Sequence, residues 1–173
     1  PEGMVESCME FLRICRDENF NNVVVSIKTS NTAMMVTTVR RLVRVMAEEG
    51  ISYPLHLGVT EAGGGNRGLI KSFIGIGSLL CDGIGDTLRV SLTDDPTEEV
   101  DAAKQILQAV GMEGQCGLDI VSCPTCARTK IDLIPLVKRF ESAVAAEGLS
   151  DVPVKVALMG CVVNGRGEAR EAH

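Results

Sequence analysis

Apolar residues alternate along the chain between two spacings. In four segments they return every three or four positions, which gives a helix one apolar face; these segments are residues 4–18, 32–50, 67–83 and 97–111. Three shorter apolar runs lie at 21–28, 53–63 and 86–93 and are typical of strands. The first run is so rich in β-branched residues that it indicates a strand buried on both faces.

The three strands are predicted to begin near residues 22, 54 and 86, a recurrence of about 32 residues. This is the length of one strand-plus-helix unit, and a parallel return between strands needs such a crossover helix. The sequence therefore predicts an α/β fold with a parallel sheet. Both a closed barrel and an open doubly wound sheet fit this order.

Polar residues stand where each of these strands is expected to end. Lys28, Glu61 and Ser91 hold such positions. In parallel α/β folds the carboxyl ends of the strands form the ligand face, so we expect Lys28 and Glu61 to be functional. Asn31 and Thr97 hold positions typical of helix N-caps.

A glycine-rich seam, GMEGQCG, divides the chain at residues 111–117. After it the pattern predicts a strand, a helix, a second strand and a final loop, at 118–122, 131–147, 153–159 and 160–169. The sequence thus predicts two domains, residues 1–112 and a smaller α/β domain at 117–173.

Composition excludes several classes of protein. The net charge is −6, and there is no Trp and only one Tyr, so we expect no binding to nucleic acid. No apolar stretch is long enough for a membrane span, and the first residues lack the pattern of a signal peptide. Seven cysteines in an acidic chain favour metal binding or catalysis in a reducing compartment over a disulfide framework.

Three cysteines hold positions that suit soft-metal chemistry. Cys123 and Cys126 bracket the turn CPTC after one predicted strand, and Cys161 follows the next strand. Paired thiols of this kind bind one metal ion or cluster, or act as a dithiol redox pair. Glu168, in the glycine-flanked loop GCVVNGRGEA, is a candidate fourth ligand. Because a hard carboxylate binds iron weakly, such a ligand would leave a displaceable position for substrate.

This pattern leaves three interpretations open: an iron–sulfur site, a zinc-stabilised structural or interaction module, and a CxxC dithiol oxidoreductase. We expect His56 to be a hydrogen-bonded residue rather than a ligand. The other cysteines that lie on apolar helix faces are interpreted as core residues, because a free cysteine packs as a small hydrophobe; they are Cys8, Cys15 and Cys81. Cys116 has no assigned role.

Four blocks of sequence, CPTC, GCVVNGRGEA, HLGVTEAG and GIGDTLRVSLTDDP, together resemble the 4-hydroxy-3-methylbut-2-enyl diphosphate synthase family of the non-mevalonate isoprenoid pathway. The resemblance implies a TIM barrel joined to a smaller reductase-like α/β domain with a [4Fe-4S] cluster. It implies that the cluster ligands are Cys123, Cys126, Cys161 and Glu168. The implied reaction opens the ring of 2-C-methyl-D-erythritol 2,4-cyclodiphosphate reductively and expels water.

The resemblance also implies roles for residues outside the cluster. Lys28, Arg89 and Ser91 match diphosphate contacts, Glu61 matches an acid/base carboxylate, and Asn164 matches a polar residue that faces the substrate. The implied partners are a flavodoxin or ferredoxin electron donor and a second subunit in a homodimer. The implied location is the cytoplasm of a bacterium, or the plastid stroma of a plant or alga.

The chain departs from the family pattern in three ways. A complete barrel takes about 250 residues, so residues 1–112 match only the last three strand–helix units. Residues 117–173 stop short of the end of the cluster domain, and Arg166 stands where the family usually has proline. We therefore expect a piece of the enzyme, incomplete at both ends and inactive by itself.

Overall fold

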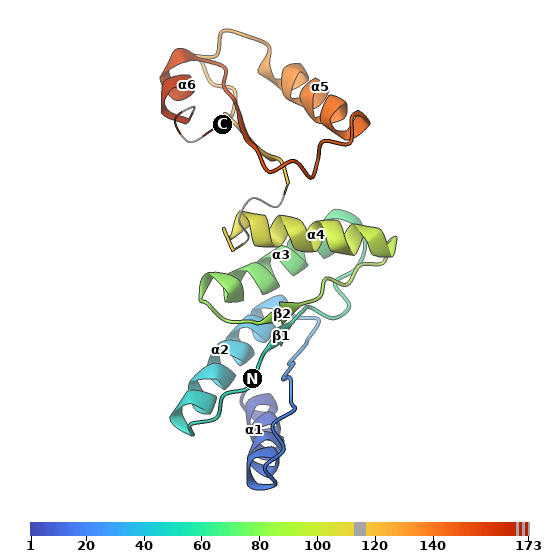
Figure 1. The fold of residues 1–173 in the computed structure, drawn as a ribbon, viewed down its shortest axis with the longest axis vertical. Coiled ribbons are helices and arrows are strands. Elements are labelled where there is room, and N and C mark those ends of the chain that lie inside the picture. Colours follow the sequence, from blue (N-terminus) through green and yellow to red (C-terminus); the bar gives the residue numbers. More distant parts are fainter. Residues whose placement is uncertain (113–116, 169, 171, 173) are drawn as a thin grey trace. The chain divides into compact units, whose positions relative to one another are not determined.

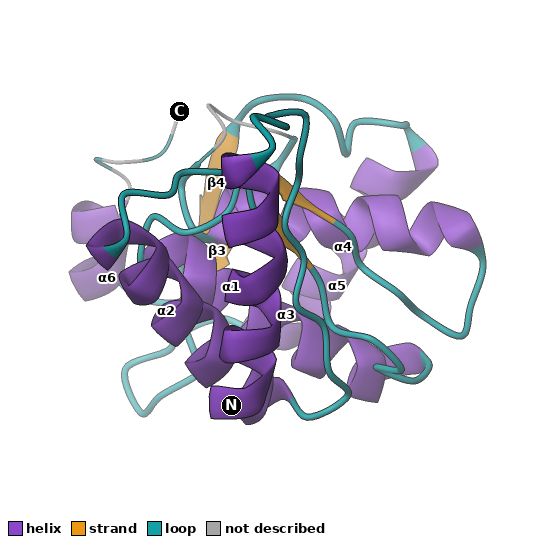
Figure 2. Cartoon of the chain, turned by 90° about the horizontal axis from the view of Figure 1, so that it is seen from below, coloured by secondary structure: helices purple, strands orange, loops and turns teal. Residues whose placement is uncertain are grey.

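The computed structural model describes residues 1–112, 117–168, 170 and 172. It divides into two compact units, Pro1–Met112 and Glu113–His173 (Figure 1). Helices and loops make up most of both units, and the strands are short (Figure 2). Among the described residues, no helix is long and apolar enough to cross a membrane.

The first unit alternates short parallel strands with helices, as the spacing predicts. Its helices are α1 (Glu2–Asp17), α2 (Thr32–Glu48), α3 (Gly65–Cys81) and α4 (Pro96–Ala109), and its strands are β1 (His56–Leu57) and β2 (Thr87–Leu88). The two strands pair in parallel, His56 opposite Thr87. A parallel bridge between Val25 and Leu55 adds the preceding segment at the edge of β1. The predicted α/β class with parallel pairing is confirmed.

The core of this unit lies between the helices and one face of the strand segments. The apolar stripes of α1, α2 and α3 bury Met9, Met35 and Ile76, while Leu57 and Val59 fill the core from the strand side. Along the chain α1 packs on α2, α2 on α3, and α3 on α4 (Figure 1). The helices therefore cover one face of the strand segments.

The segment 21–28 differs from its prediction. It was expected to be a strand buried on both faces, but it forms only the single bridge at Val25. Val25 and Ile27 are buried, whereas Ser26 is exposed and Val24 is 61% exposed. The prediction of burial on both faces is wrong, because helices cover only the side that carries Val25 and Ile27.

The helix ends follow local hydrogen bonding. Asn31 caps α2, since its side-chain oxygen accepts from the Met34 N–H at 2.9 Å, as predicted. Thr97 is not a cap, and that prediction is wrong. The cap of α4 is Asp95, whose carboxylate accepts from both the Thr97 N–H and the Thr97 hydroxyl, while Pro96 takes the first helical position.

The interpretation of three cysteines as core residues holds only in part. Cys8 and Cys15 on α1 are half-buried, and burial raises the pKa of the Cys8 thiol. Cys81 is exposed, so its placement in the core is wrong. It is the last residue of α3.

The second unit contains one parallel strand pair. Strands β3 (Asp119–Ser122) and β4 (Lys155–Leu158) pair in parallel, with Ser122 opposite Leu158. Helix α5 (Leu133–Ala146) connects them and buries Leu133 and Val144. The final segment was predicted to be a loop, but residues Val162–Glu168 form helix α6. Its glycines each weaken a helix by about 1 kcal/mol without preventing one.

Candidate functional site

Two cationic side chains lie together above the strands of the first unit. Lys28 is half-buried, and its Nζ and Cε atoms are each 3.2 Å from the point that a Cβ on Gly58 would occupy. The Arg89 carbonyl oxygen is 2.9 Å from the same point. Burial, and then the positive charge of Arg89, lower the pKa of Lys28. Three neighbouring strand segments therefore place one residue each at the same level: Lys28, Gly58 and Arg89.

His56 lies two residues before Gly58, so the alternation of a strand places it on the same face, one row away. Its Nδ1 atom is 2.8 Å from the Thr87 hydroxyl, so His56 is hydrogen-bonded, as predicted. Burial is the largest cause that lowers the pKa of His56, and the charges of Lys28 and Arg89 lower it further. Three nitrogen-bearing side chains thus share one face, where burial and neighbouring positive charge disfavour the charged forms of Lys28 and His56.

The two cationic side chains of this face form no ion pair among the described residues. Neither Lys28 nor Arg89 forms an ion pair with another residue in the part of the chain that the structure describes. An open groove of about 510 Å³ lies beside Lys28, between the start of α1 and residues 26–28. Paired cations without a carboxylate partner favour an anion, and a phosphate group suits them chemically.

Glu61 and Ser91 occupy the turns that follow β1 and β2. Glu61 is exposed and has a φ of 54°, a left-handed conformation that is unfavourable for a non-glycine residue. Ser91 is half-buried. The two turns are joined where the Thr93 N–H donates to the Gly63 carbonyl at 3.2 Å. No hydrogen bond or ion pair between described residues links Glu61 to Lys28, Arg89 or Ser91.

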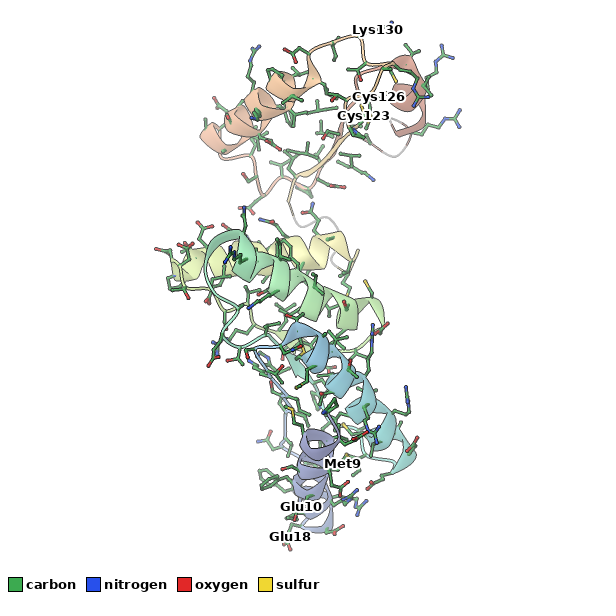
Figure 3. All side chains as sticks on the ribbon, turned by 180° about the vertical axis from the view of Figure 1, so that it is seen from behind. Met9, Glu10, Glu18, Cys123, Cys126 and Lys130 are labelled. Carbon is green, nitrogen blue, oxygen red and sulfur yellow. The ribbon has the colours of Figure 1, made fainter. Side chains whose placement is uncertain are left out.

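The second unit brings the paired cysteines to the carboxyl ends of its strands. The Cys123 N–H donates to the Leu158 carbonyl at 3.3 Å, which extends the β3–β4 pairing by one residue. The Gly160 N–H donates to the Cys123 Sγ atom, also at 3.3 Å. In Figure 3, Cys123 and Cys126 lie at the same end of the unit. A groove of about 420 Å³ opens between Cys123 and α5.

Arg128 lies against two of the three candidate thiols. Its backbone N–H, and next its side chain, hydrogen-bond the Cys126 sulfur and lower the pKa of that thiol. The side-chain hydrogen bond to Cys126 is the largest cause that raises the pKa of Arg128, and the negative charges of Cys126 and then Cys161 raise it further. The guanidinium of Arg128 is therefore hydrogen-bonded to Cys126 and lies within electrostatic range of Cys161. A lowered pKa favours the thiolate, which is the form that binds metal.

The thiols of Cys123, Cys126 and Cys161 are donors of the type that soft metals prefer. Three thiols lie just after neighbouring strand ends, with an N–H directed at the Cys123 sulfur and a guanidinium at the Cys126 sulfur. Within residues 1–112 and 117–168, leaving aside the side chains of Asn164 and Glu168, no three His, Cys, Asp or Glu are arranged to hold a metal ion. The side chains of Asn164 and Glu168, and all of Cys116, lie outside the described residues.

Sequence reasoning missed the residues that support the predicted ones. Arg128 and Thr129 stand two and three residues after Cys126, and a hydroxyl three residues on is at the spacing where a side chain reaches back to the main chain. That signal was available. The contact of Gly160 with Cys123 had no sequence signal, because it depends on the register of β3 and β4.

The two units therefore define an α/β protein with neighbouring cationic side chains in one unit and thiols at strand ends in the other. The chain belongs to the GcpE family: the GcpE TIM-barrel domain matches residues 1–104, and the GcpE protein C-terminal domain matches residues 119–173. The resemblance seen in the sequence motifs is confirmed.

Relatives in several bacteria are about half identical to this chain over the aligned residues. A 4-hydroxy-3-methylbut-2-en-1-yl diphosphate synthase (flavodoxin) of Clostridium acetobutylicum is 52% identical over 171 residues, covering 99% of this chain and 46% of the relative. A synthase of the same name from Clostridium perfringens is 49% identical over 172 residues, covering 99% and 47%. The corresponding synthase (ferredoxin) of Prochlorococcus marinus is 47% identical over 173 residues, covering 99% and 41%. The chain spans a little under half the length of these curated relatives.

Proposed function

We propose that this chain is the C-terminal part of a 4-hydroxy-3-methylbut-2-enyl diphosphate synthase. The reaction is the reductive ring opening of 2-C-methyl-D-erythritol 2,4-cyclodiphosphate, which takes up two electrons and two protons and releases one water. The observation that carries the proposal is the match of both units to the GcpE family, in a chain whose second unit gathers thiols at strand ends.

In this proposal residues 1–112 contribute the last three strand–helix units of a TIM-type barrel and bind the substrate. Lys28 and Arg89 hold the diphosphate through their unpaired charges, and Ser91 donates a hydrogen bond to it. Glu61 holds and transfers a proton from the turn after β1. The absence of ion-pair partners for Lys28 and Arg89 among the described residues supports this assignment.

Residues 117–173 are proposed to form the larger part of a reductase-like iron–sulfur domain. Cys123, Cys126, Cys161 and Glu168 would hold a [4Fe-4S] cluster, and Asn164 would face the substrate. When bound, the cluster supplies single electrons received from flavodoxin or ferredoxin, the donors that the names of the relatives carry. The lowered pKa of Cys126 supports its role as a thiolate ligand.

The remaining parts of the proposal concern the setting. The substrate is a small cyclic diphosphate, the full-length enzyme is a homodimer, and the protein works in the cytoplasm of a bacterium or in a plastid. Nucleic acid and membrane are not partners. The acidic net charge of −6 supports the exclusion of nucleic acid.

The first test measures iron, zinc and acid-labile sulfide in the chain purified without oxygen, beside a Cys161→Ser variant. The proposal expects about four irons and four sulfides per chain, lost in the variant. One zinc without sulfide, together with failure to reconstitute a cluster, would instead establish the zinc-stabilised module. If the chemistry of the chain depended on Cys123 and Cys126 alone and Cys161 were dispensable, the result would favour the dithiol interpretation.

A second test addresses the reaction. This chain replaces the corresponding C-terminal part of the Clostridium acetobutylicum synthase, to which it is 52% identical, and product formation is followed with a chemical reductant. The proposal expects turnover by the chimera and none by its Cys161→Ser variant. A folded, cluster-loaded chimera that makes no product would contradict the assigned reaction while leaving the cluster intact.

A further inference from the structure

Gly160 connects the two segments that carry the thiols of the second unit. Its N–H donates to the Cys123 Sγ atom at 3.3 Å, and its carbonyl accepts from the Lys130 N–H at 2.9 Å. It also directly precedes Cys161 in the chain. One residue therefore touches the sulfur of Cys123, the main chain at Lys130 after the CPTC turn, and the start of the segment that presents Cys161.

Glycine is needed at position 160 for space. A Cβ there would lie 2.6 Å from the Thr129 Cγ2 atom and 3.3 Å from its Oγ1 atom. The first distance is shorter than real Cβ contacts, so Thr129 would have to move. The φ of Gly160 lies outside the left-handed region, so the backbone itself could accept an alanine. The requirement is the close approach of Thr129.

Thr129 in turn holds the second cysteine of the turn by two hydrogen bonds. The Cys126 N–H donates to the Thr129 Oγ1 atom at 3.0 Å, and the Thr129 N–H donates to the Cys126 carbonyl at 2.9 Å. The same side chain rests on Gly160 through its γ-methyl group. Any shift of Thr129 away from Gly160 therefore disturbs the main chain at Cys126.

We infer that Gly160 and Thr129 are positioning residues of the thiol site, which hold the Cys123 and Cys126 sulfurs in register with the segment that starts at Cys161. The inference rests on the proposed function, because the group to be held is the iron–sulfur cluster. The Gly160 N–H also stabilises negative charge on the Cys123 sulfur, so it raises the reduction potential of a bound cluster.

The test compares matched variants of the full chain, reconstituted without oxygen from ferrous iron and sulfide. Gly160→Ala forces Thr129 away, whereas Gly167→Ala in α6 is the control, since a Cβ there meets nothing within 4 Å. Thr129→Val keeps the shape but removes the acceptor for the Cys126 N–H. Thr129→Ser keeps that acceptor and removes only the γ-methyl group.

Two readouts follow: the concentration of an iron chelator that removes half of the bound iron, and the midpoint potential from a redox titration followed by electron paramagnetic resonance. Gly160→Ala is expected to lower the chelator concentration about ten-fold, at the low end of the effect of losing an outer ligand contact. Thr129→Val should lower it about five-fold, the factor for one hydrogen bond of about 1 kcal/mol. Thr129→Ser and Gly167→Ala should match the wild type.

The midpoint potential separates positioning from mere stability. It should fall in Gly160→Ala, because the residue-160 main chain takes up part of the crowding against Thr129 and its N–H then lies farther from the Cys123 sulfur. It should stay unchanged in Gly167→Ala. Suppose that the wild type binds the cluster and that Gly160→Ala and Thr129→Val both match its chelator concentration and its midpoint potential. This result overturns the inference about Gly160 and Thr129 but leaves the proposed function standing. A wild type that takes up no cluster overturns both. If Gly160→Ala fails to fold, the difference between Thr129→Val and Thr129→Ser decides.

Discussion

Replacing Gly58 with alanine is expected to destabilise the first unit and to weaken its affinity for diphosphate. A Cβ at this buried position would lie 2.9 Å from the Arg89 carbonyl oxygen and 3.2 Å from both Nζ and Cε of Lys28. Lys28 can move its flexible end, but the Arg89 carbonyl belongs to the neighbouring strand. The strands must therefore separate slightly, and the head of Lys28 must leave its place.

The size of the effect follows from two opposing contributions. Adding a methyl group to a tightly packed position costs about 1–3 kcal/mol. Alanine also restricts the unfolded chain, which returns about 0.4–1 kcal/mol because the φ of Gly58 lies outside the left-handed region. The net loss is about 1.3 kcal/mol, with an upper limit of about 2.6 kcal/mol. For the unit Pro1–Met112, with an unfolding entropy of about 2.1 cal/mol/K per residue, this lowers Tm by about 5–6 °C, and by about 11 °C at the upper limit.

The measurement is thermal unfolding by calorimetry, beside the control Gly77→Ala in α3. A Cβ at position 77 meets nothing within 4 Å, so alanine there gains helix propensity and should raise Tm by about 2–4 °C. The two substitutions thus have opposite signs. A second measurement titrates inorganic pyrophosphate, which Gly58→Ala should bind more weakly than the control does. Equal or higher Tm in Gly58→Ala would refute the packing argument.

Three further predictions concern single groups. The pKa of His56, measured by proton NMR, should lie below its ordinary value and rise in Lys28→Met. Because the unfolded chain binds this proton more readily than the folded chain does, the free energy of unfolding should fall as pH drops through the histidine range. Asn31→Ala should cost about 1 kcal/mol in chemical denaturation, since it removes the cap of α2. In the metal-free chain, Arg128→Gln should raise the pKa of Cys126 and slow its alkylation by iodoacetamide at neutral pH.

The apolar spacing predicts the helices well because burial of one face is what determines them. The helix expected at 131–147 is Leu133–Ala146, and the one expected at 4–18 is Glu2–Asp17. The strand segments were predicted in type and pairing but not in length, since β1 and β2 pair over only two residues each. The apolar residues of a segment indicate that it forms a strand. The number of residues that pair depends on the neighbouring strand segments, which the local pattern does not contain.

The candidate site could be predicted in its reactive groups but not in its supports. Cysteines and lysines have chemistry that can be recognised in a sequence, and their positions after strands follow from the pattern. Helix α6 was missed because Asn164, Gly165 and Gly167 are turn-forming residues, and the cost of about 1 kcal/mol for each glycine does not prevent the helix. The role of Gly160 depends on distances between segments, which no local pattern contains.

Two glycines make the same physical contribution to the two sites. Gly58 leaves room for Lys28, and Gly160 leaves room for Thr129, although neither has a left-handed backbone. Gly50 and Gly148 differ, since they follow α2 and α5 with φ of 65° and have open space around them. Alanine at Gly50 or Gly148 strains the backbone and affects stability alone. Alanine at Gly58 or Gly160 displaces a neighbouring side chain, so it changes ligand affinity or cluster retention together with stability.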